Sequence, residues 1–93
     1  MSWKVFPGHL GMQSEPLQPK LERYLIRRRL QKKFNKQLLL FLNNPRHPSL
    51  HTERLEPKAV GLYSFRIDLK YRVIFGFHSQ GVIEIVDITD HYQ

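Results

Sequence analysis

The chain has 93 residues, enough for one domain with one compact core, which we assign to residues 1–93. A hydrophobic content of 41% argues against disorder, and no apolar run approaches the ~18 residues that a membrane-spanning helix needs. The N-terminus lacks the apolar stretch of a signal peptide, and without cysteine there are neither disulfides nor thiolate metal sites, so we expect a cytoplasmic protein.

The charge of the chain is strongly positive and unevenly distributed. A formal net charge of +7 favours a polyanionic partner such as nucleic acid or an acidic protein. Eight of the fifteen basic residues lie between Lys20 and Lys36, against the single acid Glu22. A solvated helix face is the alternative interpretation, but such unneutralised charge repels itself and therefore favours a partner. A membrane-surface role ranks last, because these residues surround the helix instead of lining one side.

The first half of the chain predicts a strand, a loop and two helices. Trp3–Phe6 has the pattern of a short strand, and the prolines and glycines after it indicate a loop. Helix-forming residues fill Leu21–Leu42 without glycine or proline. The apolar positions change face within this stretch, so we expect two antiparallel helices with a break near Arg27–Arg29. Pro45 ends the helical stretch, because proline disfavours helix at the residue before it.

The second half predicts a loop followed by three strands. Residues 45–60 are rich in proline, histidine and cations and indicate the loop. Alternating apolar residues predict strands over Leu62–Leu69, Tyr71–His78 and Val82–Ile88, with a tight turn between the first two. The expected fold is α+β, with an N-terminal strand and a two-helix hairpin packed on one face of a small antiparallel sheet. The other sheet face is then available for a site.

Two arginines interrupt the apolar pattern of neighbouring strands. Arg66 and Arg72 lie on the less apolar sides of their strands, and antiparallel pairing would bring both onto one face of the sheet. The planar, permanently charged guanidinium group suits phosphate. The alternative is that either arginine pairs with Asp68 or Asp87 for purely structural reasons.

Together with Arg66 and Arg72, the residues Glu53, His91 and Tyr92 provide the types of group needed to cleave a phosphodiester without a metal. We expect Glu53, in a loop with Arg54, Lys58 and nearby histidines, to act as a general base for a ribose 2′-OH. His91 can act as the general acid, since histidine titrates near neutrality, and Tyr92 can stack on a base or contact the phosphate. The alternatives are a solvated loop glutamate and a frayed chain end.

His47 and His51 suggest a metal site by number alone. Pro48 lies between them and makes the helical spacing of two metal ligands unavailable, and no ordered carboxylate is expected nearby. We therefore expect no metal and no other cofactor.

Taken together, residues 28–92 resemble the RelE/ParE superfamily of bacterial toxin–antitoxin toxins. The resemblance rests on the order and spacing of several segments: a helix ending Leu42-Asn43-Asn44-Pro45-Arg46, then Pro48-Ser49-Leu50, Glu53-Arg54-Leu55, SFRI, YRVIF and a terminal His-Tyr. Within the superfamily the chain is most similar to YoeB-like ribonucleases. The functional residues of that group correspond to Glu53, Arg66, Arg72, His91 and Tyr92.

The resemblance implies a microbial-RNase-like fold, mRNA cleavage in the ribosomal A site, and inhibition by a small acidic antitoxin. The basic residues would then contact RNA, the antitoxin or both, and the candidates for RNA binding are Arg27, Arg28, Lys32, Lys33, Lys36, Arg46, Arg54 and Lys58. The leading hypothesis is a metal-independent endoribonuclease. The alternatives are a non-nuclease toxin that inhibits DNA gyrase, as in the ParE branch, and a basic module that only binds RNA or protein.

Overall fold

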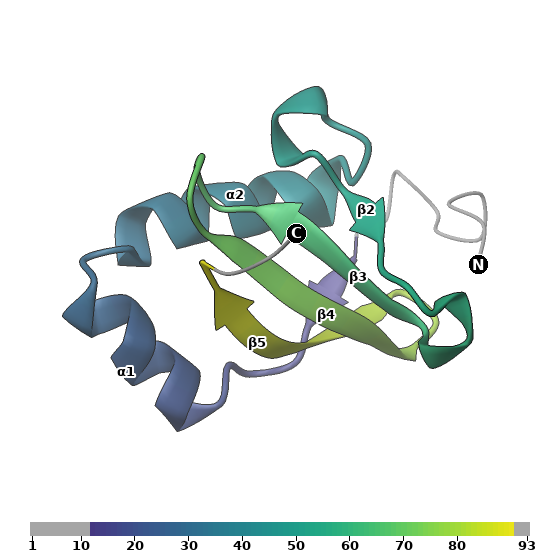
Figure 1. Cartoon of the computed structure of the whole chain (residues 1–93), viewed down its shortest axis with the longest axis horizontal. Coiled ribbons are helices and arrows are strands. Elements are labelled where there is room, and N and C mark those ends of the chain that lie inside the picture. The colour runs from purple at the N-terminus through teal and green to yellow at the C-terminus, as the bar shows by residue number, and fades with distance from the viewer. Residues whose placement is uncertain (1–11, 91–93) are drawn as a thin grey trace.

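The computed structural model describes residues 12–90, which form two helices and a five-stranded mixed sheet (Figure 1). The strand order across the sheet is β1-β5-β4-β3-β2. In chain order the elements are β1 (Gln13–Ser14), α1 (Pro19–Arg27), α2 (Gln31–Asn43), β2 (Glu53–Arg54), β3 (Leu62–Arg66), β4 (Arg72–Ser79) and β5 (Val82–Thr89). Two short 3₁₀ turns, Pro48–Leu50 and Lys58–Val60, flank β2. The expected α+β fold is confirmed.

The helical stretch divides where the apolar pattern changes face. α1 begins with Pro19 in its first turn, a position where the missing backbone N–H costs nothing. It ends at Arg27, and Arg29 adopts a left-handed backbone with φ of 57° before α2 begins. The break near Arg27–Arg29 is therefore confirmed. α2 ends at Asn43, two residues before Pro45, as the proline predicts.

The sheet differs from the expectation at both of its edges. Gln13–Ser14, in a segment expected to be a loop, pairs in parallel with β5, so the sheet is mixed and not purely antiparallel. Hydrogen bonds from the backbone N–H groups of Gln13 and Glu15 to the carbonyls of Gly81 and Ile83 hold this edge, at 2.8 and 2.9 Å. The expected strand at Trp3–Phe6 lies outside the described residues. At the opposite edge, Glu53–Arg54 forms β2 within the expected loop.

The three expected strands are present, with one shortened. β3 ends at Arg66 and not at Leu69, because a turn begins at Ile67 and brings the chain into β4. The Asp68 carboxylate accepts hydrogen bonds from the backbone N–H groups of Lys70 and Tyr71, both at 2.8 Å. This side chain therefore satisfies the backbone of the turn, a role that aspartate favours.

The core lies between α2 and one face of the sheet. Phe41 of α2 is fully buried, and its ring lies 5.0 Å from that of Phe65 and 4.8 Å from that of Phe75. Cross-strand pairing places Val73 opposite Phe65 on the same face. Because side chains alternate along a strand, Ser64, Arg66 and Arg72 belong to the opposite face, which the helices do not cover (Figure 1).

Asp68 also ties this turn to α2 through an ion pair, and its titration provides a test of that role. Its carboxylate lies 3.2 Å from the Lys33 ammonium. Burial alone would raise the pKa of Asp68, but the N–H groups of Tyr71 and Lys70 and the Lys33 charge together hold it below the ordinary value of 3.8. A carboxyl group whose pKa is lower in the folded state than in the unfolded state stabilises the fold at pH values above its unfolded-state pKa. This stabilisation is lost as the pH falls through the folded-state pKa.

We therefore expect Asp68→Asn to lower the free energy of unfolding by about 1 kcal/mol at pH 7, since the amide can still accept hydrogen bonds but carries no charge. The deficit relative to the native sequence should shrink as the pH falls below 3.8. Urea titrations of both proteins at several pH values measure this difference. A deficit that stays constant down to pH ~2 would mean that the charge of Asp68 contributes nothing.

Candidate active site

The strand register brings the polar residues of three strands onto the uncovered face of the sheet. Glu53 of β2 is the direct partner of Ser64 in β3, and Arg66 of β3 is the direct partner of Arg72 in β4. Directly opposed residues in an antiparallel pair project from the same face. The expectation that Arg66 and Arg72 share one face is therefore met by the observed register.

Arg72 is the centre of this cluster. Its side chain is only 9% exposed, and its Nη2 lies 3.3 Å from Glu53 Oε2. The Nε–H donates to Ser64 Oγ at 3.0 Å, and Nη2 also donates to the backbone carbonyl of His51. A buried guanidinium held from several directions has a fixed position and a low-dielectric surrounding, which are the conditions for strong interaction with an anion.

Glu53 is therefore an edge-strand residue, and the expectation that it lies in a loop was wrong. The cations expected around it are also different. Arg54 projects from the other side of β2, where its guanidinium lies 5.8 Å from the centre of the Tyr63 ring and donates to the Lys58 carbonyl. Arg72 is the cation that contacts Glu53. The Glu53 side chain is 51% exposed, so a substrate can reach the carboxylate that Arg72 holds in place.

Arg66 lies beside this pair without the partner that a structural role would require. The acids weighed as its alternatives are otherwise engaged, since Asp68 binds Lys33 and Asp87 accepts from the Ile88 backbone N–H. Within residues 12–90 the Arg66 guanidinium makes no ion pair or hydrogen bond. Its side chain is half-buried and lies on the same face as Glu53 and Arg72.

His91 and Tyr92 lie outside the described residues. β5 ends at Thr89, and Thr89 is the direct partner of Arg72 in β4. In the sequence only Asp90 separates Thr89 from His91. The described end of β5 is therefore beside Arg72.

Ser64 and the His51 carbonyl are site components that the sequence did not reveal. Ser64 is fully buried, although it belongs to the sheet face that the helices do not cover. A serine within a strand pattern does not by itself predict a role in a site. His51 contributes through its backbone, which has a left-handed conformation with φ of 44°. A buried arginine needs hydrogen-bond acceptors. The position of Arg72 within a predicted strand therefore indicated that acceptors lie near it, but not which residues supply them.

The proposed RNA-binding residues form two groups and not one patch. Arg27 and Arg28 lie at the end of α1, and Lys32, Lys33 and Lys36 follow in the first turns of α2, near the junction of the helices (Figure 1). Within this group Arg28 stacks on Tyr24, with its Cζ 3.6 Å from the ring centre, and Lys33 binds Asp68. In the second group Arg54 belongs to β2, and Arg46 and Lys58 lie in the segments before and after that strand.

The hydrogen bond between Ser64 and Arg72 allows a test of how the guanidinium is held. Ser64→Ala removes an acceptor from a buried charged donor, so we expect a loss of about 1–3 kcal/mol in the free energy of unfolding. Arg72→Met in the same background removes the donor as well, and the pair of changes should cost less than the sum of the two single changes. Urea unfolding of the four proteins gives the coupling energy directly. Additive effects would show that Ser64 does not hold Arg72.

Comparisons with known proteins identify the fold. No family model matches the sequence, and a search of curated proteins finds no relative. Among solved structures, a YoeB/ParE toxin from Agrobacterium tumefaciens superposes with a TM-score of 0.65 at 19% identity, covering 88% of this chain and 99% of that one. The heterotetrameric YoeB-YefM toxin-antitoxin complex from Staphylococcus aureus gives 0.63 at 23% identity, covering 87% and 95%.

A YoeB dimer from Staphylococcus aureus gives a TM-score of 0.58 at 23% identity, covering 88% of this chain and 97% of that one. The matched lengths leave little of either chain outside the alignment. The chain therefore has the fold of YoeB/ParE toxins, as the resemblance noted in the sequence predicts. At these identities the similarity concerns the fold, and the activity must be argued from the residues of the site.

Proposed function

We propose that this protein is the toxin of a type II toxin–antitoxin system and acts as an endoribonuclease on mRNA. The observation that carries the proposal is the contact between Glu53 and Arg72 at 3.3 Å on the uncovered sheet face, with Arg66 directly opposite Arg72. A carboxylate beside a fixed guanidinium group supplies a proton acceptor, and the guanidinium charge stabilises negative charge that develops on a phosphoryl group.

In the proposed reaction Glu53 removes the proton of a ribose 2′-OH. The 2′-oxygen then attacks the adjacent phosphorus, and the bond from phosphorus to the 5′-oxygen breaks. His91 donates a proton to the departing 5′-oxygen, while Tyr92 positions the substrate. The products are a 2′,3′-cyclic phosphate and a free 5′-hydroxyl. No electron transfer or external reactant is needed, so the groups of this chain are sufficient for the step.

Arg72 and Arg66 have different parts in this scheme. Arg72 is already fixed by Glu53, Ser64 and the His51 carbonyl, so its charge is positioned before the substrate binds. Arg66 has no such contacts within the described chain and is therefore the guanidinium that a phosphoryl oxygen would engage on binding. Charge stabilisation by a prearranged donor typically contributes about 10²–10³-fold to the rate.

The basic helices support a further proposal, that the toxin binds polyanionic partners. Ribosomal RNA around the A site and an acidic antitoxin are both suitable partners for the exposed cations at the junction of α1 and α2. The similar structures that contain YoeB together with YefM support an antitoxin as one of these partners. No described helix is long and apolar enough to cross a membrane.

The test is translation of a defined mRNA in a purified system, with the RNA 3′ ends mapped after adding the protein. The proposal predicts discrete cuts that end in cyclic phosphate, and cuts that need ribosomes would show that the activity depends on the ribosome. An intact message under conditions where translation otherwise proceeds would contradict it. Inhibition of DNA gyrase or plain RNA binding, which salt weakens steeply, would then be the functions to examine.

A further inference from the structure

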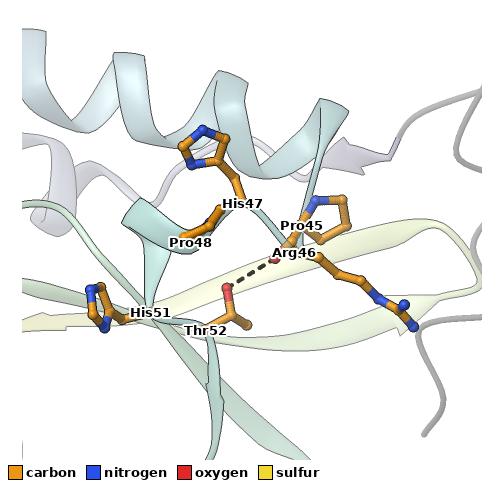
Figure 2. A pocket seen from close by; sticks show the side chains of 6 residues that line it. All are labelled: Pro45, Arg46, His47, Pro48, His51 and Thr52. Atoms are coloured by element: carbon orange, nitrogen blue, oxygen red, sulfur yellow. Dashed lines mark hydrogen bonds between the residues drawn. The ribbon is translucent and has the colours of Figure 1, made fainter.

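The loop between α2 and β2 contains a pocket that the proposed reaction does not use. The pocket has a volume of about 290 Å³. It is lined by Pro45, Arg46, His47, Pro48, His51 and Thr52 (Figure 2). The volume is sufficient for a single nucleobase with part of its sugar. Of these residues only Arg46 belongs to the proposed RNA-binding set.

Two residues that line the pocket connect it to the Glu53–Arg72 pair. The backbone carbonyl of His51, a lining residue, accepts a hydrogen bond from Arg72 Nη2, the same nitrogen that lies 3.3 Å from Glu53. Thr52, another lining residue, immediately precedes Glu53 in the chain. The pocket and the Glu53–Arg72 pair are therefore joined through residues 51–53.

The lining groups suit a nucleotide. Two imidazoles offer planar aromatic faces and two proline rings offer apolar surfaces against which a base can lie. In Figure 2 Arg46 and His51 extend to opposite sides of the loop, so the lining has a guanidinium donor on one side and an imidazole on the other. Base edges and phosphate oxygens both supply acceptors for such donors.

The hydrogen bonds of His47 determine which of its ring nitrogens is available to a ligand. Its Nδ1 accepts from the Ser49 backbone N–H at 3.2 Å and lies 3.0 Å from Ser49 Oγ. A nitrogen that accepts from a backbone N–H carries no proton, so the neutral ring must have its proton on Nε2. His47 therefore presents an N–H donor, which requires an acceptor on the ligand.

The loop that forms the pocket is tied down at two points. Thr52 Oγ1 donates to the Pro45 carbonyl at 3.1 Å and so closes the two ends of the loop on one another, as the dashed line in Figure 2 shows. Leu50 is fully buried beneath the loop and anchors it to the core. A prearranged loop loses little conformational entropy when it binds, which favours a specific site over a merely basic surface.

We propose that this pocket binds one nucleotide of single-stranded RNA, the neighbour of the nucleotide whose 2′-OH Glu53 deprotonates. The base lies against the proline and imidazole rings, and Arg46 and His47 donate to its acceptors or to its phosphate. The inference rests on the proposed function and adds to it a place where the enzyme distinguishes one RNA sequence from another.

The experiment measures binding without cleavage. A single-stranded tetranucleotide with 2′-O-methyl groups throughout cannot be cut, because it has no 2′-OH, and is titrated into the full-length protein while the imidazole proton signals are followed by NMR. His47→Asn with His51→Asn removes both rings and keeps the loop, since asparagine can accept from the Ser49 N–H and tolerates the left-handed backbone of His51. Arg23→Ala, on α1, is the control for the loss of a cation elsewhere.

We expect the His47 and His51 signals to move on titration, and the double variant to raise the Kd about tenfold or more, the size expected from loss of base stacking. Arg23→Ala should change the Kd by no more than about twofold, since one exposed charge contributes little at physiological salt. The same double variant should also relax the nucleotide preference of the cut sites in the translation assay.

Failure of this inference and failure of the proposed function give different results. If cleavage occurs and depends on Glu53, while the double variant binds and cuts with unchanged affinity and preference, the pocket is not a nucleotide site and the nuclease proposal stands. If the tetranucleotide moves the imidazole signals but no message is ever cut, the pocket binds RNA and the nuclease proposal fails.

Discussion

Replacing Glu53 with glutamine is expected to lower the rate of RNA cleavage by roughly 10²–10⁴-fold, the usual effect of removing a general base. The amide is nearly the same size as the carboxylate but cannot accept the proton of the 2′-OH. Glu53 is an exposed edge-strand residue, so the fold should survive the change. The rate of appearance of cyclic-phosphate ends in the translation assay measures the effect, and thermal unfolding checks that the variant is folded.

Two further variants make this result interpretable. His91→Ala should reduce cleavage by a similar factor of about 10²–10⁴, because it removes the proposed general acid. Glu84→Gln removes a carboxylate from an exposed position of β5 and should leave the rate unchanged. If both Glu53→Gln and His91→Ala cut RNA at the native rate, the assignment of acid and base is wrong.

Replacing Phe41 with alanine is expected to cost about 3–5 kcal/mol in the free energy of unfolding, the range seen for large aromatic residues in protein cores. Phe41 is fully buried, and its ring contacts those of Phe65 and Phe75 at 5.0 and 4.8 Å. Alanine would leave a cavity between α2 and the sheet that these strands can fill only in part. Because domains of this kind have only ~5–15 kcal/mol of stability, the variant should be close to unfolding.

Urea unfolding followed by circular dichroism measures the effect of Phe41→Ala. Leu39→Ala on the same helix is the matched control, since the Leu39 side chain is 61% exposed and its loss should change stability by no more than about 0.5 kcal/mol. Equal losses in the two variants would contradict the view that α2 is held to the sheet through Phe41.

Much of the fold was predictable because its signals are local. The change of apolar face predicted the break between α1 and α2, and period-two alternation predicted β3, β4 and β5 to within a few residues. The edge strands were missed because β1 and β2 have only two residues each, too few to show any alternation. Such strands exist because β5 and β3 present unpaired backbone groups that a passing segment can satisfy.

The candidate site was likewise predictable in part. The residue types and order of Glu53, Arg66 and Arg72 pointed to phosphodiester chemistry, and the shared face of the two arginines follows from strand alternation. The partners of Arg72 could not be predicted, because a carboxylate in an expected loop, a strand serine and a backbone carbonyl come together only through strand pairing and loop closure.

By itself, then, the amino-acid sequence determined that this is a basic domain and which residues are candidates for its chemistry: Glu53, the strand arginines Arg66 and Arg72, and His91 with Tyr92. Its periodic apolar pattern also determined which segments become helices and long strands, since those choices depend on neighbours a few residues away. Only the tertiary structure decided that Glu53 joins the sheet and meets Arg72. Such contacts depend on register between segments distant in the chain, and register is set by the packing of the whole core.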